Sequence, residues 1–357
     1  MKSTPGQFSS KDRDKVRNWW QLAGVERSRL QGGRSEGVEA LDFRTGGGLR
    51  LQILAGRGMD IGLAEYRGYP LCWLSPAGVV HPSYFREEGA GFLDSACGGL
   101  MFTCGLTQAG APCRDQGRQL GLHGRIANQP ARRVGCSAGW RGDEFIIEAT
   151  GCVEENEPFE YCLALNRTYR ARLGDSRVEI SDRVVNRGPA PAPHMILYHF
   201  NFGYPLVDEG ASVLLASQEV TARDSASDER LAEWDRVTAP AAGFSEDVFY
   251  HKLKRTPQGR ARAAVVNHQL ELGAMVDFDA RSLPRFAQWN CFNDRVYALG
   301  LEPANCLTEG RAAERKRGTL EFLQPGEERN YDIRLEVVEG ADRLAELRRL
   351  IVEDADG

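Results

Sequence analysis

Hydrophobic and polar residues alternate along most of the chain with the period of a β-strand. The clearest alternating runs are bounded by Gly, Pro, Asn or Asp, and they are LRLQILA (49–55), DEFIIEATGCV (143–153), EYCLALNRTYRARL (160–173) and RVEISDRVVN (177–186). GDE (142–144) and LGDSR (173–177) fit hairpin turns between such strands. Further runs follow toward the C-terminus: GAMVDF, RVYALGLE, GTLEFL and RNYDIRLEVVE. Regularly spaced strands of this kind predict an all-β antiparallel sandwich with short peripheral helices.

Two segments have helical spacing instead. Ser10 can cap a helix from Lys11 to about Leu22. Near the C-terminus, the run ADRLAELRRLIVED places four apolar residues on one helical face: Leu344, Leu347, Leu350 and Ile351. Because no repeat or low-complexity linker divides the chain, we predict one sandwich domain over 41–340. An N-terminal helical and strand extension (1–40) and a C-terminal helix and tail (341–357) would pack on it.

Composition and charge narrow the class of protein. Hydrophobic residues make up 42% and charged residues 27% of the 357 residues, which suits a globular protein with a large core. The net charge of −5, with arginines scattered among acids, argues against nucleic acid as a partner. The first twenty residues lack the apolar core of a signal peptide, and no run approaches the length of a membrane span. We therefore expect a cytoplasmic protein with no membrane association.

Cysteines and nucleotide motifs give no sign of a cofactor. The nine cysteines are odd in number and include no CxxC pair, which is typical of reduced thiols. No GxGxxG or GxxxxGK[ST] fingerprint follows a strand. His194 and His199 are an odd number of residues apart, so on a regular strand they face opposite sides and do not share an ion. We expect no metal and no cofactor.

The first candidate site residue, His199, lies in the continuously apolar run MILYHFNFG, which is typical of a strand buried on both faces. Asn201 follows two residues later and therefore leaves the same face of the strand. Burying such polar groups without partners costs about 2–7 kcal/mol each. Either a polar partner in the core or a ligand in a site is therefore expected to meet them.

Two other contexts hold candidate residues. In QLGLHGRIANQ, glycines flank His123, and Arg125 follows with a planar set of donors suited to hydroxyls or a carboxylate. In DRVYALGLEPANC, Glu302 ends an apolar strand just before Pro303, as either a surface charge at a strand end or an acid at the rim of the sheet.

These three contexts resemble the galactose mutarotase (aldose 1-epimerase) superfamily, in particular a bacterial aldose-epimerase-like branch. In the family, an asparagine and a proline-containing bend precede the catalytic histidine by thirteen residues, as Asn186 precedes His199 here. LHGR resembles the sugar-binding His-Gly segment, and LGLEP resembles the setting of the strand-borne glutamate. GRGMDI, WLSPAG and GGLMFTCGL fit the bacterial branch, so that the resemblance covers roughly residues 50 to 335. HFNFGYPL after the histidine and Pro-Ala-Asn after the glutamate depart from typical members, which leaves the substrate open.

The resemblance implies an isomerase that interconverts the anomers of an aldose or aldose derivative. His199, Glu302 and His123 would be catalytic: Glu302 would take the proton of the anomeric hydroxyl, and His199 would protonate the ring oxygen. The residues expected to bind the sugar are Arg125, Arg57, Asp60, Asn201, Trp289 and Asn290. Arg57 and Asp60 of GRGMDI have an alternative role as a structural ion pair, and Trp73 and Tyr297 are further aromatic candidates for stacking on the sugar ring.

Other functions are compatible with the same residues. An epimerase or aldose–ketose isomerase acting at another carbon needs an acid and a base of the same types. A non-catalytic carbohydrate-binding module could keep the pocket alone. The sequence leaves open which sugar is bound, whether it bears an acidic group, and whether the protein forms a homodimer.

Overall fold

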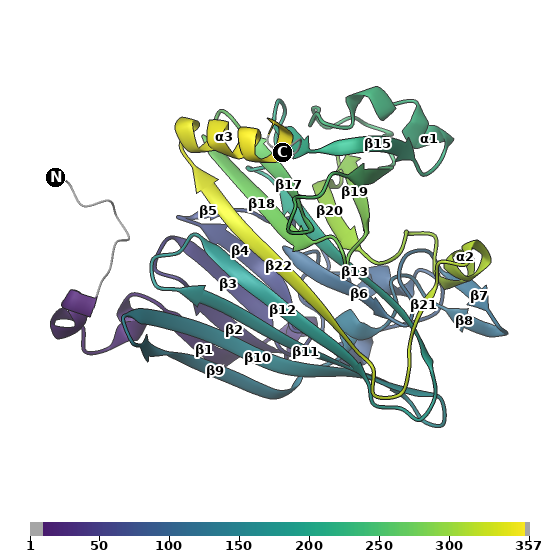
Figure 1. Cartoon of the computed structure of the whole chain (residues 1–357), viewed down its shortest axis with the longest axis horizontal. Helices are drawn as coiled ribbons and strands as arrows, with labels where there is room; N and C mark the ends of the chain where they lie inside the picture. Colours follow the sequence, from purple (N-terminus) through teal and green to yellow (C-terminus); the bar gives the residue numbers. More distant parts are fainter. Residues whose placement is uncertain (1–9, 354–357) are drawn as a thin grey trace.

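Two large antiparallel sheets form the computed structural model, which describes residues 10–353 (Figure 1). The larger sheet runs in the order β1 (Gly24–Arg29), β2 (Glu39–Arg44), β3 (Leu49–Leu54), β4 (Asp60–Tyr66), β6 (Met101–Leu106), β13 (Ala192–Gly203), β20 (Tyr297–Ala304), β19 (Arg285–Phe292), β16 (Asp247–Leu253), β15 (Ser217–Ala222). Two short strands extend it, β5 (Tyr69–Pro70) on β4 and β21 (Glu321–Leu323) on β13.

The second sheet has eight strands within the described part of the chain. Their order is β14 (Ser212–Leu215), β17 (Arg260–Asn267), β18 (Leu272–Asp279), β22 (Glu328–Glu339), β12 (Arg177–Asn186), β11 (Tyr161–Arg172), β10 (Glu144–Glu157), β9 (Arg132–Arg141). A separate hairpin consists of β7 (Cys113–Asp115) and β8 (Arg118–Leu120). The prediction of an all-β antiparallel sandwich is therefore confirmed.

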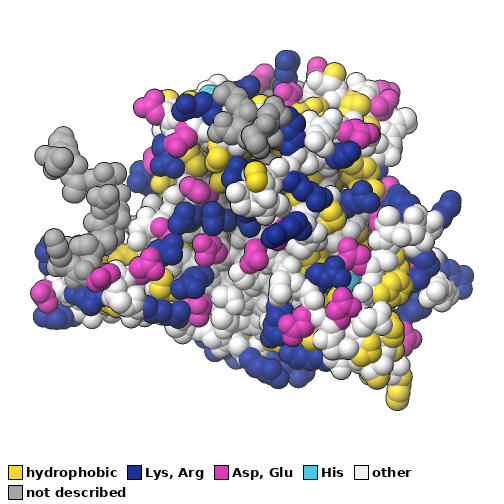
Figure 2. Space-filling view, in the orientation of Figure 1, with side chains coloured by type: hydrophobic (Ala, Val, Ile, Leu, Met, Phe, Trp, Pro, Cys, Tyr) yellow, Lys and Arg dark blue, Asp and Glu magenta, His cyan; other side chains and the backbone are white. Residues whose placement is uncertain are grey.

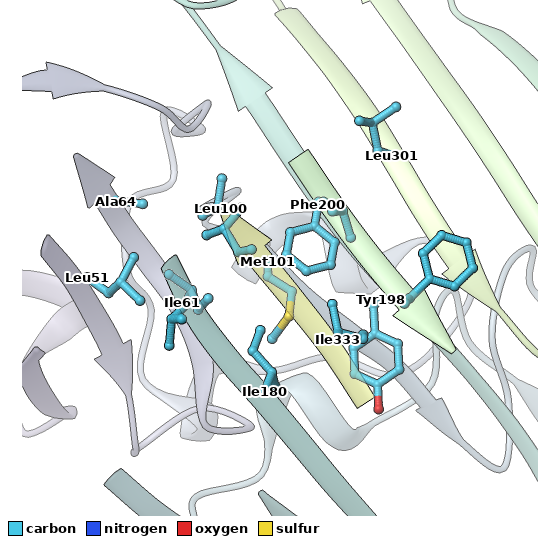
Figure 3. Packing of buried hydrophobic residues seen from close by; sticks show 14 of the residues in the cluster. Leu51, Ile61, Ala64, Leu100, Met101, Ile180, Tyr198, Phe200, Leu301 and Ile333 are labelled. Atoms are coloured by element: carbon cyan, nitrogen blue, oxygen red, sulfur yellow. The ribbon is translucent and has the colours of Figure 1, made fainter. Parts of the chain in front are cut away.

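The main core lies where the inner faces of the two sheets meet. Leu51, Met101 and Phe200 of the larger sheet pack in one buried cluster with Ile180 and Ile333 of the second sheet (Figure 3). Side chains of a strand alternate between its two faces, so every second residue of these strands enters the core. Burial of apolar surface on this scale is the main stabilising contribution to the fold.

Helices are short and peripheral. The α-helices are α1 (Ser225–Asp228), α2 (Arg311–Arg317) and α3 (Ala341–Arg348), and a π-helical turn (Arg349–Glu353) follows α3. The 3-10 turns are Ser10–Lys15, Trp19–Gln21, Gly33–Ser35, Pro82–Tyr84, Gly91–Ser95, Ile126–Asn128 and Leu231–Glu233. Helix α3 buries Leu344 and Leu347 against the outer face of the second sheet, beside Val266 and Met275. This packing confirms the predicted C-terminal helix, whereas the predicted tail at 354–357 lies outside the described residues.

The predicted helix from Lys11 to Leu22 is wrong. The segment forms two short 3-10 turns, Ser10–Lys15 and Trp19–Gln21, because Asn18 between them is extended (φ −115°, ψ 104°). The Asn18 side chain accepts a hydrogen bond from the backbone N–H of Trp20 and so begins a new turn. Trp19 packs on Trp140 and Phe145 of the second sheet, and this tertiary contact overrides the helical pattern.

The surface carries charges of both signs, and the thiols are free. Figure 2 shows basic and acidic side chains interspersed over the face in view. In residues 10–353, no helix has the length and apolar character needed to cross a bilayer. All nine cysteines are free thiols.

Candidate active site

A cavity of about 470 Å³ lies on the face of the larger sheet that points away from the sandwich core. Along β13, Ile196, Tyr198 and Phe200 enter the core, whereas His199 and Asn201 point the other way and line the cavity. The strands β6, β13, β20, β19 and β16 are neighbours in the sheet and form its floor. Loops supply its walls: the residues are Trp73, Phe92, Leu93, Ala96, Gly98, Gly110, Ala111, Pro112, Leu122, His123, Arg223, Glu246, Val296 and Thr308.

Strand register brings His199 and Glu302 together. Leu197 pairs with Ala304 and Asn201 with Gly300, which places His199 directly opposite Glu302. Residues that oppose each other across antiparallel strands have neighbouring side chains. The His199 Nε2 atom lies 3.1 Å from Glu302 Oε1. The structure thus unites in one cavity two residues that lie about a hundred positions apart in the sequence.

Gly300 makes room for this pair. A Cβ atom at residue 300 would lie 2.8 Å from Glu302 Oε1, 3.0 Å from the Trp289 Cβ and 3.1 Å from His199 Cε1. On the other side of the histidine, the Phe102 ring of β6 stacks on the imidazole with the centroids 4.5 Å apart. The imidazole therefore lies between the Phe102 ring and Gly300, and any residue larger than glycine at position 300 would crowd the imidazole.

Burial shifts the pKa values of both groups. It raises the pKa of Glu302 to about 8, with a smaller contribution from the nearby Glu246 carboxylate, and it lowers the pKa of His199 well below 6.5. At neutral pH the pair therefore holds one proton between its two members. The Nδ1 atom of His199 is buried and has no hydrogen-bond partner among the described residues. Perturbed groups that line a cavity and keep an unpaired polar atom are typical of catalytic sites.

His123 enters the same cavity from a strained loop. Its backbone lies in the left-handed region (φ 59°), next to Gly124, where a Cβ would come within 2.3 Å of the Gln108 carbonyl oxygen. The His123 ring meets the His199 ring edge-on, with centroids 5.9 Å apart, and its Nδ1 atom lies 3.1 Å from the Cys104 sulfur. Burial lowers the pKa of His123 to about 4, so the ring is neutral at pH 7.

Two of the predicted sugar-binding residues line the cavity. Asn201 Nδ2 donates to the Gly99 carbonyl at 3.1 Å, which fixes the amide at the cavity wall. Trp289 Nε1 donates to Glu246 Oε2 at 2.8 Å, and its ring packs edge-on against that of Trp73, another lining residue.

Four predicted sugar-binding residues do not line this cavity. Arg125 Nε donates to Glu87 Oε1 at 2.6 Å. Arg57 donates to the backbone carbonyls of Val80 and Ser95 and to the side chain of Asn128, so it forms no pair with Asp60.

Asp60 instead accepts from Arg167 and Thr103 inside the sandwich. Asn290 accepts from Gln288 on the opposite face of β19 from Trp289. The aromatic candidate Tyr297 also lies off the cavity, with its hydroxyl donating to the Thr238 carbonyl.

No motif in the sequence singled out the charged pair Arg223 and Glu246. Arg223 Nη2 lies 2.9 Å from Glu246 Oε1, and both residues line the cavity. Arg223 comes from the stretch after β15, which is polar and contains no strand-end motif. Glu246 immediately precedes the buried strand β16, and a carboxylate at a strand boundary is the signal that had singled out Glu302.

His194 has no part in the cavity. Its Nδ1 atom bonds the Leu106 carbonyl at 3.2 Å and its Nε2 atom bonds the Tyr331 hydroxyl at 2.6 Å, within the sandwich. Over residues 10–353, no group of three or more His, Cys, Asp or Glu side chains is arranged to hold a metal ion.

Comparisons with known proteins place the chain in a family. The family model described as "Domain of unknown function (DUF4432)" matches residues 35–337. No curated protein matches the sequence. A crystal structure from Klebsiella pneumoniae subsp. pneumoniae MGH 78578, named a "putative aldose 1-epimerase", is 27% identical with a TM-score of 0.90, over 98% of this chain and 91% of that one.

A second solved structure, a galactose mutarotase-like protein from Clostridium acetobutylicum, shares the fold. It is 13% identical with a TM-score of 0.63, over 90% of this chain and 100% of that one. The resemblance inferred from the sequence motifs is therefore confirmed at the level of the fold. The chain belongs to the DUF4432 family, and its fold is that of the galactose mutarotase-like β-sandwiches.

Proposed function

We propose that this protein is an isomerase of the aldose 1-epimerase type, which interconverts the anomers of an aldose with Glu302 and His199 as the acid–base pair. One observation carries the proposal: the two groups face each other at 3.1 Å, buried, at the floor of a cavity large enough for a monosaccharide. The solved relative from Klebsiella pneumoniae, named a "putative aldose 1-epimerase", has the same fold over 98% of the chain.

The single proton held by the pair suits ring opening. With the proton on His199, the Glu302 carboxylate takes the proton of the anomeric hydroxyl while the imidazolium protonates the ring oxygen. The bond between carbon 1 and the ring oxygen breaks, and an open-chain aldehyde forms. After rotation about the bond between carbons 1 and 2, both protons return along the same routes and the ring closes as the other anomer.

The short distance within the pair lets its proton move between the two groups. Transfer between Nε2 and Oε1 over 3.1 Å converts the state with a carboxylate and an imidazolium into the state with a carboxylic acid and an imidazole. Because burial raises the pKa of Glu302 above that of His199, the resting pair holds its proton on Glu302, and the reverse transfer forms the carboxylate and imidazolium that open the ring. Acid–base groups of this kind each contribute about 10²–10⁴-fold in rate.

The test is anomeric exchange measured by saturation-transfer NMR on a panel of free aldoses. Glu302→Gln and His199→Asn should each slow enzyme-catalysed exchange by about 10²–10⁴-fold, with the fold intact by circular dichroism. Glu219→Gln, an exposed residue of β15 outside the cavity, is the matched control and should keep the wild-type rate. If Glu302→Gln exchanges its best substrate at the wild-type rate, the proposed role of the pair is wrong.

The same spectra separate reaction at carbon 1 from reaction at another carbon. In D₂O, proton transfer between oxygen atoms leaves every carbon-bound hydrogen of the sugar in place. An epimerase or aldose–ketose isomerase would replace a carbon-bound hydrogen with deuterium. Enzyme-dependent loss of a carbon-bound proton signal would therefore support that second reaction over mutarotation.

The pH dependence of the rate follows from the shared proton. The pair loses this proton as the pH rises through the Glu302 pKa of about 8, so the exchange rate should fall above that pH. On the acid side, the pair gains a second proton only well below 6.5, because burial lowers the pKa of His199. The rate should therefore stay level from about pH 6.5 to 8.

A further inference from the structure

The cavity contains no cation left free for an acidic substrate. Arg223 is the one Lys or Arg side chain among the described residues that line it. Its guanidinium contacts two carboxylates, Glu246 Oε1 and Asp224 Oδ2, each at 2.9 Å. Glu246 also accepts from Trp289 Nε1 at 2.8 Å, which holds the carboxylate beside the arginine. The charges of this corner therefore sum to about −1, which disfavours an anionic ligand.

The histidines do not supply the missing positive charge. Burial lowers the pKa of His123 to about 4, so this ring is neutral at pH 7. His199 shares its single proton with Glu302, and the net charge of that pair is zero. Arg125, the other guanidinium that the sequence suggested, is paired with Glu87 and does not line the cavity.

Part of the cavity wall is aliphatic and aromatic. Phe92, Leu93 and Ala96 come from one wall segment, and Leu122, whose backbone N–H bonds the Gly89 carbonyl, lies beside that segment. Pro112 is a further apolar lining residue. These side chains have no hydrogen-bonding atoms. A sugar hydroxyl placed against them would lose its water without gaining a partner, which is unfavourable.

The polar lining side chains gather around the acid–base pair and at Arg223 and Glu246, and Thr308, whose hydroxyl bonds that of Tyr250, adds one beside Ala111. His123, His199 and Glu302 surround the position proposed for the anomeric centre. Asn201 and Glu246 are within the same lining and can meet neighbouring hydroxyls. The cavity is thus polar around carbon 1 and apolar around the far edge of the ring.

We infer that the substrate is a neutral deoxy aldose, whose hydroxyl-free carbon or methyl group lies against the apolar side chains of Phe92, Leu93 and Leu122. This inference rests on the proposed function and deepens it, since it assigns the substrate class of the same site. It excludes aldoses whose far edge carries a carboxylate, phosphate or sulfonate.

Sugars that differ at one carbon test the inference. Anomeric exchange would be measured by NMR for D-fucose, D-galactose and D-galacturonate, for D-quinovose, D-glucose and D-glucuronate, and for 2-deoxy-D-ribose and D-ribose. In the set that contains the fastest substrate, the deoxy sugar should have a kcat/KM about 10–100-fold above that of its hydroxylated parent. The reason is that an apolar pocket discriminates against an added hydroxyl by up to about 10²-fold. The uronate should be the poorest. A parent sugar or a uronate that surpasses its deoxy counterpart in every set would overturn the inference.

Variants at the wall tie the preference to this cavity. Leu93→Asn adds a hydrogen-bonding group at a position with 59% exposure, so the fold should tolerate it. It should reduce the ratio of kcat/KM between deoxy and parent sugars by several-fold. Leu74→Asn, at 51% exposure and outside the lining, is the matched control and should leave the ratio unchanged. An unchanged ratio in Leu93→Asn would contradict the placement of the deoxy carbon.

A gain-of-function variant tests the role of the two carboxylates beside Arg223. The double variant Asp224→Asn with Glu246→Gln frees the Arg223 guanidinium, while asparagine can still cap α1. The kcat/KM for a uronate relative to its neutral parent should rise by about 10-fold in this variant. A ratio that does not rise would contradict the role of the two carboxylates.

These outcomes separate the two proposals. If wild-type protein exchanges no aldose faster than Glu302→Gln does, the proposed function fails and the substrate class falls with it. If wild-type protein exchanges a fully hydroxylated or anionic aldose best, the function stands and only the substrate class is wrong.

Discussion

Tyr198 and His199 are neighbours on β13, yet their side chains contact two very different groups of buried charges on opposite faces of the sheet. The Tyr198 hydroxyl points into the sandwich and donates to Asp182 at 2.7 Å. His199 points out of the same strand toward Glu302. Asp182 belongs to an inner charge cluster in which Arg167 bonds both Asp60 and Asp182 at 2.8 and 2.6 Å.

The two groups differ in how completely their polar atoms are bonded. In the inner charge cluster, Arg167 also donates to the Thr103 hydroxyl and lies near the Met59 carbonyl, and none of its nitrogens is left without a partner. In the outer pair, the Nδ1 atom of His199 is buried without a partner in the described part of the chain. Completely bonded charges specify a structure, whereas an unpaired polar atom beside a cavity is left available for a substrate.

Removing the centre of the inner charge cluster should have the largest effect. Arg167→Met leaves Asp60 and Asp182 buried without a counter-charge, so the free energy of unfolding should fall by about 3–5 kcal/mol in a urea titration. Arg183→Gln is the matched control, because its pair with Glu328 is exposed and should contribute about 0–1 kcal/mol. Equal losses for the two variants would show that the inner charge cluster has no structural role.

Filling the space beside the outer pair should slow catalysis and also lower stability. Gly300→Ala places a methyl group against Glu302, Trp289 and His199, so anomeric exchange should slow by at least about 10-fold, with a loss of about 1–3 kcal/mol in stability. Gly139→Ala is the matched control, since its added methyl group meets nothing within 4 Å. If Gly300→Ala exchanged anomers at the wild-type rate, the geometry of the His199–Glu302 pair would not determine the activity.

Replacing the titratable carboxyl of Glu302 should stabilise the protein at neutral pH. Burial raises the Glu302 pKa from 4.5 to about 8, so at pH 7 the folded state binds a proton that the unfolded state releases. This difference lowers stability increasingly as the pH rises from 4.5 to about 8. Glu302→Gln should therefore raise the free energy of unfolding by about 3 kcal/mol at pH 7 and by little at pH 4.5. A loss of stability at pH 7 would show that Glu302, like the inner charge cluster, has a structural role.

The smallest effect is expected at Arg125, which belongs to neither group. Its bond to Glu87 is partly exposed and lies outside the cavity, so Arg125→Gln should cost no more than about 1 kcal/mol. The kcat/KM for anomeric exchange should stay within about twofold of the wild-type value. A tenfold or larger rise in KM would instead show that Arg125 binds the sugar.

The local pattern of apolar and polar residues determined the strands and was enough to identify His199 and Glu302 as candidate catalytic residues. The alternation of apolar and polar residues depends on the two faces of a strand, and this property is local, so the all-β class could be predicted from the sequence. His199 in an apolar strand and Glu302 at the end of another were visible for the same reason. The helix expected at Lys11 to Leu22 failed because the contact of Trp19 with a distant sheet decided that segment.

Only the tertiary structure decided which polar side chains share a cavity. A strand's sequence shows which residues share a face but not whether that face meets the core or a cavity, and Asp60 and Arg57 proved to be bonded inside the protein. Arg223 and Glu246 reach the cavity from segments with no motif. The pairing of β13 with β20 is a long-range contact, and it set the distance between His199 and Glu302. The sequence therefore supplied the chemical groups, and strand register and burial decided their partners and their pKa values.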